Sequence, residues 1–482
     1  MQLNHPELLK QQAYINGVWV DAADQKIIAV TNPATGEEIA TVPSVSAKQV
    51  EQAVDAAEVA LKTWKLTTAK ERSSLLRKWF DLIVAHQEDL AVILSTEQGK
   101  PLTESRGEIL YGASFIEWFA EEAKRTYGDV IPYDKQSRRL VVIKQPVGVV
   151  AAITPWNFPN AMITRKVGPA LAAGCTVIIK PASETPLSAL ALVALAEQAG
   201  IPKGVVNVVT GSSREIGGVL TSHPSVKKVS FTGSTQVGKL LMEQCSSTMK
   251  KISMELGGNA PFIVFEDANL DKAIEGVIAS KFRNSGQTCV CTNRILVHEN
   301  VHDAFVEKMT VAVQKLKVAP AFEKGAEQGP LINEKAVEKI EEHIADAVAK
   351  GAQVIVGGKR HALGQTFFEP TLMVDVTPNM LVAKDETFAP LAPVFKFSTD
   401  DQAIQMANDT EFGLASYIYT ESLSRAWKLG EALEYGMVGI NEGLISTEVA
   451  PFGGIKESGT GREGSKYGIE DYLEIKYMCM GI

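Results

Sequence analysis

From residue 147 onward, short and almost continuously apolar segments alternate with segments that have helical spacing. The first apolar segment, 149–153, is rich in β-branched residues, and a helix-like stretch at 161–173 follows it. Strands that are apolar on both faces and are followed by helices are typical of a parallel sheet covered on both sides. We therefore predict an α/β fold.

The alternation continues in two blocks. We expect further strands at 176–179, 205–209, 229–231 and 261–265, and further helices at 47–64, 71–93, 188–198, 270–284 and 301–316. The first block ends in the segment Glu255–Asn259, and the second runs to about residue 440. We place a domain boundary close to Leu256.

Composition excludes several classes of protein. The 482 residues include 45% hydrophobic residues and carry a net charge of −9 with mixed signs, which predicts two or three globular domains. No basic stripe with interleaved aromatic residues occurs, so we expect no nucleic-acid partner. The longest uncharged run, 145–164, contains three prolines, so we expect no membrane segment.

Cysteine usage and the first residues predict a cytoplasmic location. Residues 1–12 are polar and lack the apolar region of a secretory signal. The five cysteines are odd in number, and their spacing shows no disulfide framework.

Two literal motif matches lack the context that their chemistry needs. His298–His302 spells the zinc-peptidase pattern H-E-x-x-H, but 295–297 has the pattern of a strand and Asn300 that of a helix N-cap. The two histidines would then not share a helical face. The segment 459–464 matches G-x-G-x-x-G, but it follows a glycine-rich loop instead of a strand. We expect no metal site and no dinucleotide site at these positions.

A third match has the right context. Gly233–Lys239 follows the strand at 229–231 and opens a helix, as in a P-loop. Leu240 stands where a P-loop supplies the hydroxyl that holds magnesium, which argues against a nucleoside triphosphatase, the rival from another class. Backbone amides at a helix start bind phosphate without a metal ligand, which favours the pyrophosphate of a dinucleotide.

Residues 283–289 place a cysteine on a turn. The segment ends an amphipathic helix, and Gly286 allows backbone conformations that other residues adopt at a cost. A thiolate is the best side-chain nucleophile near neutral pH when its surroundings favour ionisation. Taken alone, the spacing also fits a buried, inert cysteine.

The sequence resembles the aldehyde dehydrogenase superfamily over almost its whole length. Seven short motifs carry the resemblance in the family's order: Thr154–Pro159, Lys180–Ser183, Phe231–Thr235, Glu255–Asn259, Gly286–Cys289, Glu386–Pro390 and Pro451–Gly454. Ala389 departs from the pattern, because the family usually has glycine there.

The resemblance implies three structural units. Residues 1–125 and 147–255 would form a Rossmann-like dinucleotide-binding domain, and residues 256–440 a second α/β domain with the catalytic residues. Residues 126–146 and 456–482 would form a small β element for oligomerisation, in a homodimer or homotetramer.

The resemblance also implies the catalytic residues. Cys289 would attack the aldehyde to form a thiohemiacetal, whose oxyanion the side-chain amide of Asn157 and the backbone N–H of Cys289 would stabilise. Hydride transfer would leave a thioester, and Glu255 would activate the water that hydrolyses it. General-base work of this kind calls for a raised pKa in an apolar site. Under oxidising conditions, Cys291 could form a disulfide with Cys289 and stop turnover.

The family's cofactor site would use residues from several motifs. They are Trp156, Asn157, Lys180, Pro181, Ala182, Ser183, Gly233, Ser234, Leu256 and Glu386. Ser183 stands where NAD-preferring relatives often carry a glutamate, so a 2′-phosphate would not be repelled, and Lys180 could pair with it. We expect NADP as the cofactor, with NAD as the alternative because Glu184 follows.

Within the superfamily, the segments 160–166 and 461–468 most resemble those of enzymes that oxidise succinate semialdehyde. A small aldehyde with a distal carboxylate needs a cationic clamp, and the planar fork of arginine suits it. Arg165 and Arg283 would form the clamp, with Ser446 beside them. Glutarate semialdehyde stays an alternative, because one methylene usually discriminates by only about 1–3 kcal/mol.

Overall fold

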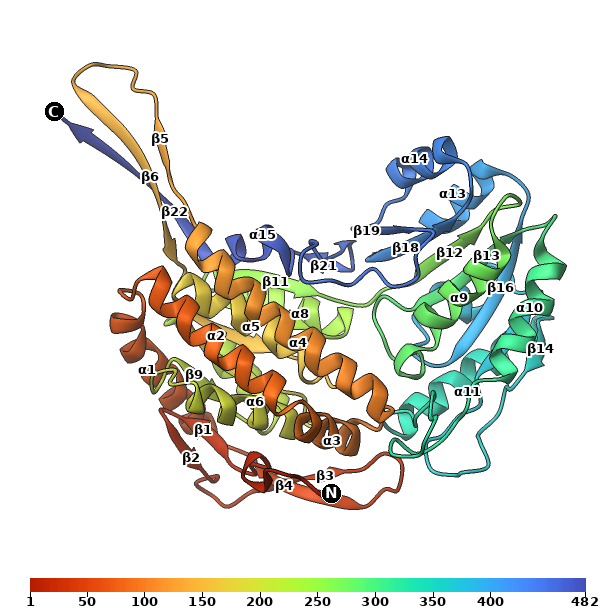
Figure 1. Ribbon diagram of the computed structural model, residues 1–482, viewed down its shortest axis with the longest axis horizontal. Coiled ribbons are helices and arrows are strands. Elements are labelled where there is room, and N and C mark those ends of the chain that lie inside the picture. The colour runs from red at the N-terminus through yellow and green to blue at the C-terminus, as the bar shows by residue number, and fades with distance from the viewer.

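Two large sheets, each covered by helices on both faces, make up most of the computed structural model of residues 1–482 (Figure 1). The first sheet has the spatial order β2 (Val18–Val20), β1 (Ala13–Ile15), β9 (Val206–Val208), β8 (Thr176–Lys180), β7 (Val149–Ile153), β10 (Val226–Thr232), β11 (Lys251–Glu255) and β21 (Gly459–Thr460). The strands from β9 to β11 are parallel, and antiparallel strands close both edges. This arrangement confirms the predicted α/β fold class.

Helices form layers on both faces of the first sheet. One face carries α1 (Ala47–Trp64), α7 (Ser213–Ser222) and α8 (Thr235–Ser246). The other carries α5 (Ala161–Ala173) and α6 (Leu187–Gln198), with α2 (Ala69–Ala85), α3 (Gln87–Gln98) and α4 (Leu102–Glu122) packed outside them. Both layers bury apolar side chains against the sheet, which explains why its central strands are apolar on both faces.

The second sheet is built in the same way. Its order is β14 (Gln353–Val356), β15 (Thr371–Val374), β16 (Leu391–Phe397), β13 (Thr292–His298), β12 (Ala260–Val264), β18 (Ala415–Tyr419) and β19 (Met437–Ile440), and only β14 is antiparallel. One face carries α9 (Leu270–Lys281) and α10 (His302–Gln314), and the other α11 (Glu334–Ala349), α12 (Leu381–Lys384), α13 (Asp400–Asn408) and α14 (Leu423–Ala432).

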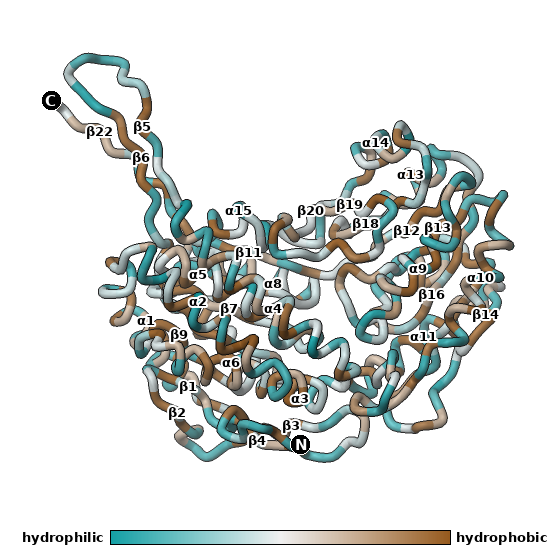
Figure 2. The backbone as a smooth tube through the Cα atoms, in the orientation of Figure 1, coloured by the Kyte–Doolittle hydropathy of each residue, from teal (hydrophilic) through white to brown (hydrophobic).

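A third, three-stranded sheet projects from the body as an arm (Figure 1). It pairs β5 (Asp129–Ile131) with β6 (Arg138–Pro146) and β6 with β22 (Leu473–Gly481), both antiparallel. Figure 2 shows apolar stretches along β5 and β6, although the arm is surrounded by solvent. Val130 on β5 is 80% exposed and Ile475 on β22 is 71% exposed.

Smaller elements complete the chain. They are the hairpin of β3 (Ile27–Thr31) and β4 (Glu38–Pro43), the pair β17 (Phe412–Gly413) and β20 (Ile455–Lys456), α15 (Ser465–Gly468), and short 3-10 turns at Pro6–Leu8, Ala123–Arg125, Arg283–Gly286 and Glu470–Tyr472. None of the helices combines the length and the apolarity needed to cross a lipid bilayer.

Most of the predicted elements are confirmed, and two helices are corrected. The stretch 71–93 forms two helices, because the backbone of His86 leaves the helical region at φ −106° and ψ 20°. The helix predicted at 270–284 ends at Lys281, because Asn284 has a left-handed conformation. The limits predicted for the three units stay a prediction, although within 456–482 the strand β21 extends the first sheet.

The candidate site follows from how the two large sheets face each other. The chain crosses from the carboxyl end of β11 at Glu255 to the amino end of β12 at Ala260. Ligands of open α/β sheets bind beyond the carboxyl ends of the strands. The carboxyl edge of the first sheet therefore meets the amino edge of the second, and the motifs of the sequence gather between them.

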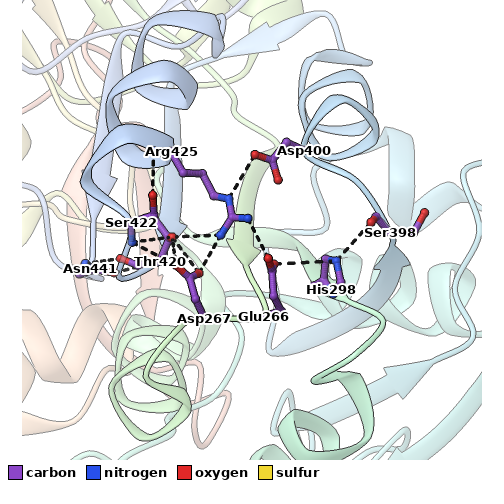
Figure 3. Close-up of polar contacts among 9 residues, drawn as sticks. All are labelled: Glu266, Asp267, His298, Ser398, Asp400, Thr420, Ser422, Arg425 and Asn441. Carbon is purple, nitrogen blue, oxygen red and sulfur yellow. Dashed lines mark hydrogen bonds and ion pairs between the residues drawn. The ribbon is translucent and has the colours of Figure 1, made fainter.

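Ion pairs close the carboxyl edge of the second sheet instead (Figure 3). Arg425 lies 2.8 Å from Glu266, 2.9 Å from Asp267 and 3.2 Å from Asp400, measured from its guanidinium nitrogens to carboxylate oxygens. His298, the last residue of β13, lies 3.2 Å from the carbonyl oxygen of Ser398. The predicted strand-to-helix turn at His298 is confirmed, because α10 begins only at His302.

Candidate active site

Cys289 follows a turn whose backbone is left-handed over three consecutive residues. The φ angles are 51° at Asn284, 54° at Ser285 and 74° at Gly286. A Cβ atom on Gly286 would lie 2.2 Å from the carbonyl oxygen of Ala389, so only glycine fits there. Contacts from distant parts of the chain support the turn. The backbone N–H of Asn284 donates to Glu104 at 2.9 Å, and the Ser285 hydroxyl donates to the carbonyl oxygen of Gly329 at 3.0 Å.

Asn157 lies beside this turn, just beyond the carboxyl end of β7. Its side-chain amide donates to the carbonyl oxygen of Gln287 at 3.0 Å. Its own carbonyl oxygen accepts from the ammonium of Lys100 at 2.7 Å and from the side chain of Asn284 at 3.1 Å. The predicted oxyanion residue is therefore held from two sides, next to the predicted nucleophile.

Lys100 was not predicted as a site residue. It is 2% exposed, and its ammonium lies 2.6 Å from the carboxylate of Glu108 and 3.9 Å from the centre of the Phe158 ring. Glu108 also accepts from the backbone N–H of Asn160 at 3.0 Å, at the start of α5. The only sequence signal is a lysine between Gly99 and Pro101, and such a signal does not distinguish a buried lysine from a surface one.

Glu255 ends β11 and is 2% exposed. Neither of its carboxylate oxygens has a hydrogen-bond partner within the chain. Burial, together with the negative charge of Glu463, raises the pKa of Glu255 well above its ordinary value. An unpartnered carboxyl group with a raised pKa fits a base whose partner is a water molecule or a substrate.

Glu463 is buried among positively charged side chains. Its carboxylate contacts the ammonium of Lys166 and lies 2.8 Å from the guanidinium of Arg165. Burial opposes its ionisation, but Lys166 and Arg165 hold the pKa of Glu463 below its ordinary value. The sequence signal for this cluster is the charged pair 165–166 inside the mostly apolar helix α5. Of this pair, only Arg165 was predicted as a site residue.

The environment of Cys289 favours the thiol form of its sulfur. Burial raises the pKa of Cys289 to about 12, and the positive charge of Arg165 opposes this effect. Arg165 itself is 1% exposed and lies 3.9 Å from the centre of the Phe452 ring. The structure thus places Arg165 in contact with Glu463, at the back of the site.

A cavity of about 530 Å³ adjoins the turn that leads to Cys289. Arg283, Ser446, Tyr111 and Phe158 line it, and Arg165 does not. The guanidinium of Arg283 lies 4.8 Å from the centre of the Phe158 ring. Burial raises the pKa of Tyr111, and the charges of Arg165 and Arg283 oppose this effect. Its hydroxyl group, which we had not assigned to the site, is buried without a partner.

The predicted residues for the adenosine end of a dinucleotide lie at the carboxyl end of β8. The ammonium of Lys180 donates to the Ser213 hydroxyl at 2.8 Å. Burial lowers the pKa of Lys180 to about 8, and the charge of Glu184 opposes this. Pro181 is buried, and Ala182 and Ser183 are half-buried. A bound phosphate would stabilise the charged form of this buried lysine, so the residues present fit a phosphorylated ribose.

The start of α8 fits a pyrophosphate. Gly233 precedes Ser234, whose hydroxyl accepts from the backbone N–H of Val237 at 3.4 Å. A Cβ atom on Gly238 would lie 2.4 Å from Leu256, so α8 packs closely on the segment after β11. Lys239 pairs with Glu457 at 2.7 Å. The lysine of the P-loop match therefore pairs with a carboxylate at the surface.

Glu386 lies against the segment that follows β11. Its carboxylate accepts from the backbone N–H of Gly258 at 3.2 Å, and burial raises its pKa to about 7. A Cβ atom on Gly257 would lie 2.9 Å from the same carboxylate. The rings of Trp156 and Phe388 meet edge to face at 5.6 Å. A half-buried carboxyl group with acceptor capacity to spare fits the hydroxyls of a second ribose.

Comparisons with known proteins show which proteins the chain is similar to. A family model described as the aldehyde dehydrogenase family matches residues 19–478. A glutarate-semialdehyde dehydrogenase from Pseudomonas aeruginosa is 63% identical over 481 residues, and a succinate-semialdehyde dehydrogenase from Escherichia coli, named for NADP(+), is 62% identical over 482 residues; both matches cover 100% of each chain. A crystal structure of succinate-semialdehyde dehydrogenase from Burkholderia pseudomallei has a TM-score of 0.99 at 60% identity and covers 100% of each chain.

Proposed function

The chain belongs to the aldehyde dehydrogenase family, and on that premise we propose that it oxidises succinate semialdehyde to succinate with NADP. The observation that supports the substrate is the cavity of about 530 Å³ at the turn that leads to Cys289, because Arg283 and Ser446 both line it. In the proposed complex, the carboxylate of the four-carbon semialdehyde would bind the guanidinium of Arg283, and its aldehyde carbon would lie at the sulfur of Cys289. Arginine is suited to this contact because two of its N–H groups can bind one carboxylate.

Cys289 and Asn157 would carry out the first step. The Cys289 sulfur attacks the carbonyl carbon, and Glu255 accepts the thiol proton because its carboxylate has no competing partner. The carbonyl oxygen gains negative charge, which the side-chain amide of Asn157 stabilises once it leaves Gln287. Lys100 and Asn284 hold the backbone of Asn157 during this exchange.

The dinucleotide would bind along the carboxyl edge of the first sheet. Lys180 and Ser183 would hold the adenosine ribose with its 2′-phosphate, Gly233 and Ser234 the pyrophosphate, and Glu386 the other ribose. Pro181, Ala182, Leu256 and Trp156 would line the groove. When bound, the nicotinamide supplies the hydride acceptor that turns the thiohemiacetal at Cys289 into a thioester. After Glu255 has released the thiol proton to solvent, it would take a proton from the water that attacks the thioester and releases succinate.

Glutarate semialdehyde is a second candidate substrate. The relative from Pseudomonas aeruginosa that is named for it is 63% identical, against 62% for the succinate-semialdehyde dehydrogenase from Escherichia coli. This difference is too small to separate the two substrates. One methylene in such a cavity is worth about 1–3 kcal/mol, so both aldehydes can turn over at different rates.

The proposed function predicts a specific order of rates. We expect kcat/KM to be highest for succinate semialdehyde with NADP, lower with NAD, and lower for butanal, which lacks the carboxylate. Arg283→Gln should lower kcat/KM for succinate semialdehyde by about 10–100-fold, because a hydrogen bond to a charged group is lost, and should leave butanal almost unchanged. The formation of reduced nicotinamide measures all of these rates.

Two outcomes would contradict the proposal. If Arg283→Gln lowers kcat/KM equally for butanal and succinate semialdehyde, Arg283 does not bind the substrate carboxylate. A higher kcat/KM for glutarate semialdehyde than for succinate semialdehyde would make glutarate semialdehyde the preferred substrate. Arg77→Gln is the control, because it makes the same change in charge at an exposed position on α2, away from the site.

We further propose that the arm of β5, β6 and β22 binds a second copy of the chain, in a dimer or tetramer. Exposed apolar side chains on a projecting sheet support this, since monomeric proteins rarely expose such a patch. A double variant with Val130→Asp and Ile475→Lys should sediment as a smaller species than the parent. Leu66→Lys, at a side chain that is 77% exposed on the body, is the control. An unchanged sedimentation rate in the double variant would contradict the proposal.

A further inference from the structure

Lys281 and Cys291 lie on either side of the segment that carries Cys289. Lys281 is the last residue of α9, and Cys291 directly precedes β13. Both residues are 0% exposed, and the side-chain nitrogen of Lys281 lies 3.2 Å from the sulfur of Cys291. This pair has no place in the proposed reaction.

The surroundings direct the two groups toward each other. The only other side-chain contact of the Lys281 nitrogen is the amide oxygen of Asn293 at 3.4 Å, and no carboxylate lies within ion-pair distance of it. The remaining polar contacts of the Cys291 sulfur are the carbonyl oxygens of Lys281 and Thr292, both at 3.5 Å. Burying a lysine side chain without an ion pair is costly, so its placement against a sulfur calls for a chemical account.

We propose that Lys281 and Cys291 form a redox modification site, at which a hydroperoxide converts the pair into a covalent sulfenamide. Cys289, two residues away, is partly exposed, whereas Cys291 is buried, so a peroxide little larger than water would reach Cys291 through an opening of this segment. The sulfur of Cys291 then meets an amine as its nearest nucleophile, and the predicted disulfide with Cys289 is the competing product. The inference does not depend on which aldehyde the enzyme oxidises.

The chemistry balances with one molecule of hydrogen peroxide. The Cys291 sulfur attacks one peroxide oxygen, the O–O bond breaks, and a sulfenic acid and water result. Lys281 releases one proton, its nitrogen attacks the oxidised sulfur, and the S–N bond forms as the S–O bond breaks. The hydroxyl group leaves as water with a second proton from the nitrogen. Sulfur is oxidised, peroxide is reduced, and a thiol can later attack the sulfur and free the amine.

The bond would close a covalent ring around the nucleophile. The ring runs from Lys281 to Cys291 and contains Arg283, Asn284, Gln287 and Cys289. Closing this ring would restrain the left-handed turn and protect the Cys291 sulfur from further oxidation to irreversible acids. The site would then recover when a cellular thiol opens the ring.

Mass spectrometry of the full-length Cys289→Ser variant tests the proposal, because the competing disulfide cannot form there. After treatment with hydrogen peroxide, blocking of free thiols and digestion with trypsin, we expect two peptides, 273–283 with Lys281 uncleaved and 284–294, joined through Lys281 and Cys291. The joined species should have the summed mass of the two reduced peptides less two hydrogens, and dithiothreitol should separate them. Lys281→Arg in the same background keeps the positive charge but lacks the amine, so the cross-link should be absent.

Several results would overturn the proposal. They are a blocked, unreacted Cys291 thiol, a Cys291 sulfinic acid without any cross-link, and, in the wild-type chain, a Cys289–Cys291 disulfide as the product in place of the Lys281 cross-link. Circular dichroism of the treated Cys289→Ser chain shows that the reaction took place in folded protein, so the result does not depend on whether Lys281→Arg folds. Because the readout is a peptide mass, it stays valid if the enzyme acts on another aldehyde.

Discussion

Cys289→Ala is expected to lower the rate of aldehyde oxidation by at least about 10⁴-fold, because removing a catalytic nucleophile leaves only binding and oxyanion stabilisation. The formation of reduced nicotinamide with succinate semialdehyde measures the loss. Cys291→Ala is the matched control, since it removes a sulfur from the same segment without touching the proposed reaction. If Cys289→Ala turns over at the rate of the control, another residue is the nucleophile.

The environment of Cys289 adds a pH dependence to this prediction. Burial raises the pKa of its thiol to about 12, so in the free enzyme the thiolate is a minor species at neutral pH. The sulfur therefore needs a base close by when it attacks. Alkylation of Cys289 by iodoacetamide should accelerate as the pH rises, because the thiolate fraction grows toward the pKa.

Glu255→Gln is expected to slow hydrolysis of the thioester by about 10²–10⁴-fold, which is the usual contribution of a general base. Glutamine has the same shape but cannot accept the proton of the attacking water. Acylation is expected to slow less than hydrolysis, because the thiol can also lose its proton to solvent. Up to one equivalent of reduced nicotinamide should therefore form in a burst, and the acyl group should stay on Cys289. Rapid mixing detects the burst, and the mass of the intact protein detects the acyl group.

The pKa of Glu255 fixes the sign of the pH effect. Burial and the charge of Glu463 raise this pKa, so the basic carboxylate is gained only as the pH rises through the raised value. Wild-type turnover should therefore increase with pH in this range, and Glu255→Gln should lose the increase. Glu463→Gln removes the repelling charge and should move the increase to lower pH. Full steady-state turnover of Glu255→Gln without a burst would contradict the assignment.

The sequence predicted the fold more completely than the site. Strands such as β7 and helices such as α1 were found because burial on both faces leaves a continuous apolar run, and a half-buried helix leaves a periodic one. The break at His86 was not predicted, because it is a change in the backbone dihedral angles of one residue and the apolar pattern continues from α2 into α3. Such local breaks depend on the packing of each helix.

Motif residues of the site were predicted, but the residues that hold them were not. Cys289, Glu255 and Asn157 stand in short segments with a family pattern, whereas Lys100 reaches Asn157 from 57 positions away along the chain. Glu463 contacts Lys166 from 297 positions away. A contact between distant residues leaves no periodicity in the sequence. The role of Arg165 also stays a prediction, because the structure pairs it with Glu463 behind the cavity that Arg283 lines.

The left-handed backbone from Asn284 to Gly286 restricts which residue types can occupy these three positions. Asparagine and serine are among the residues that enter this conformation at a modest cost, whereas valine, isoleucine or threonine would clash with the backbone. Position 286 accepts only glycine, because the carbonyl oxygen of Ala389 occupies the space of a side chain. Variation at these three positions is therefore restricted by the shape of the backbone, although none of the three side chains takes part in bond making.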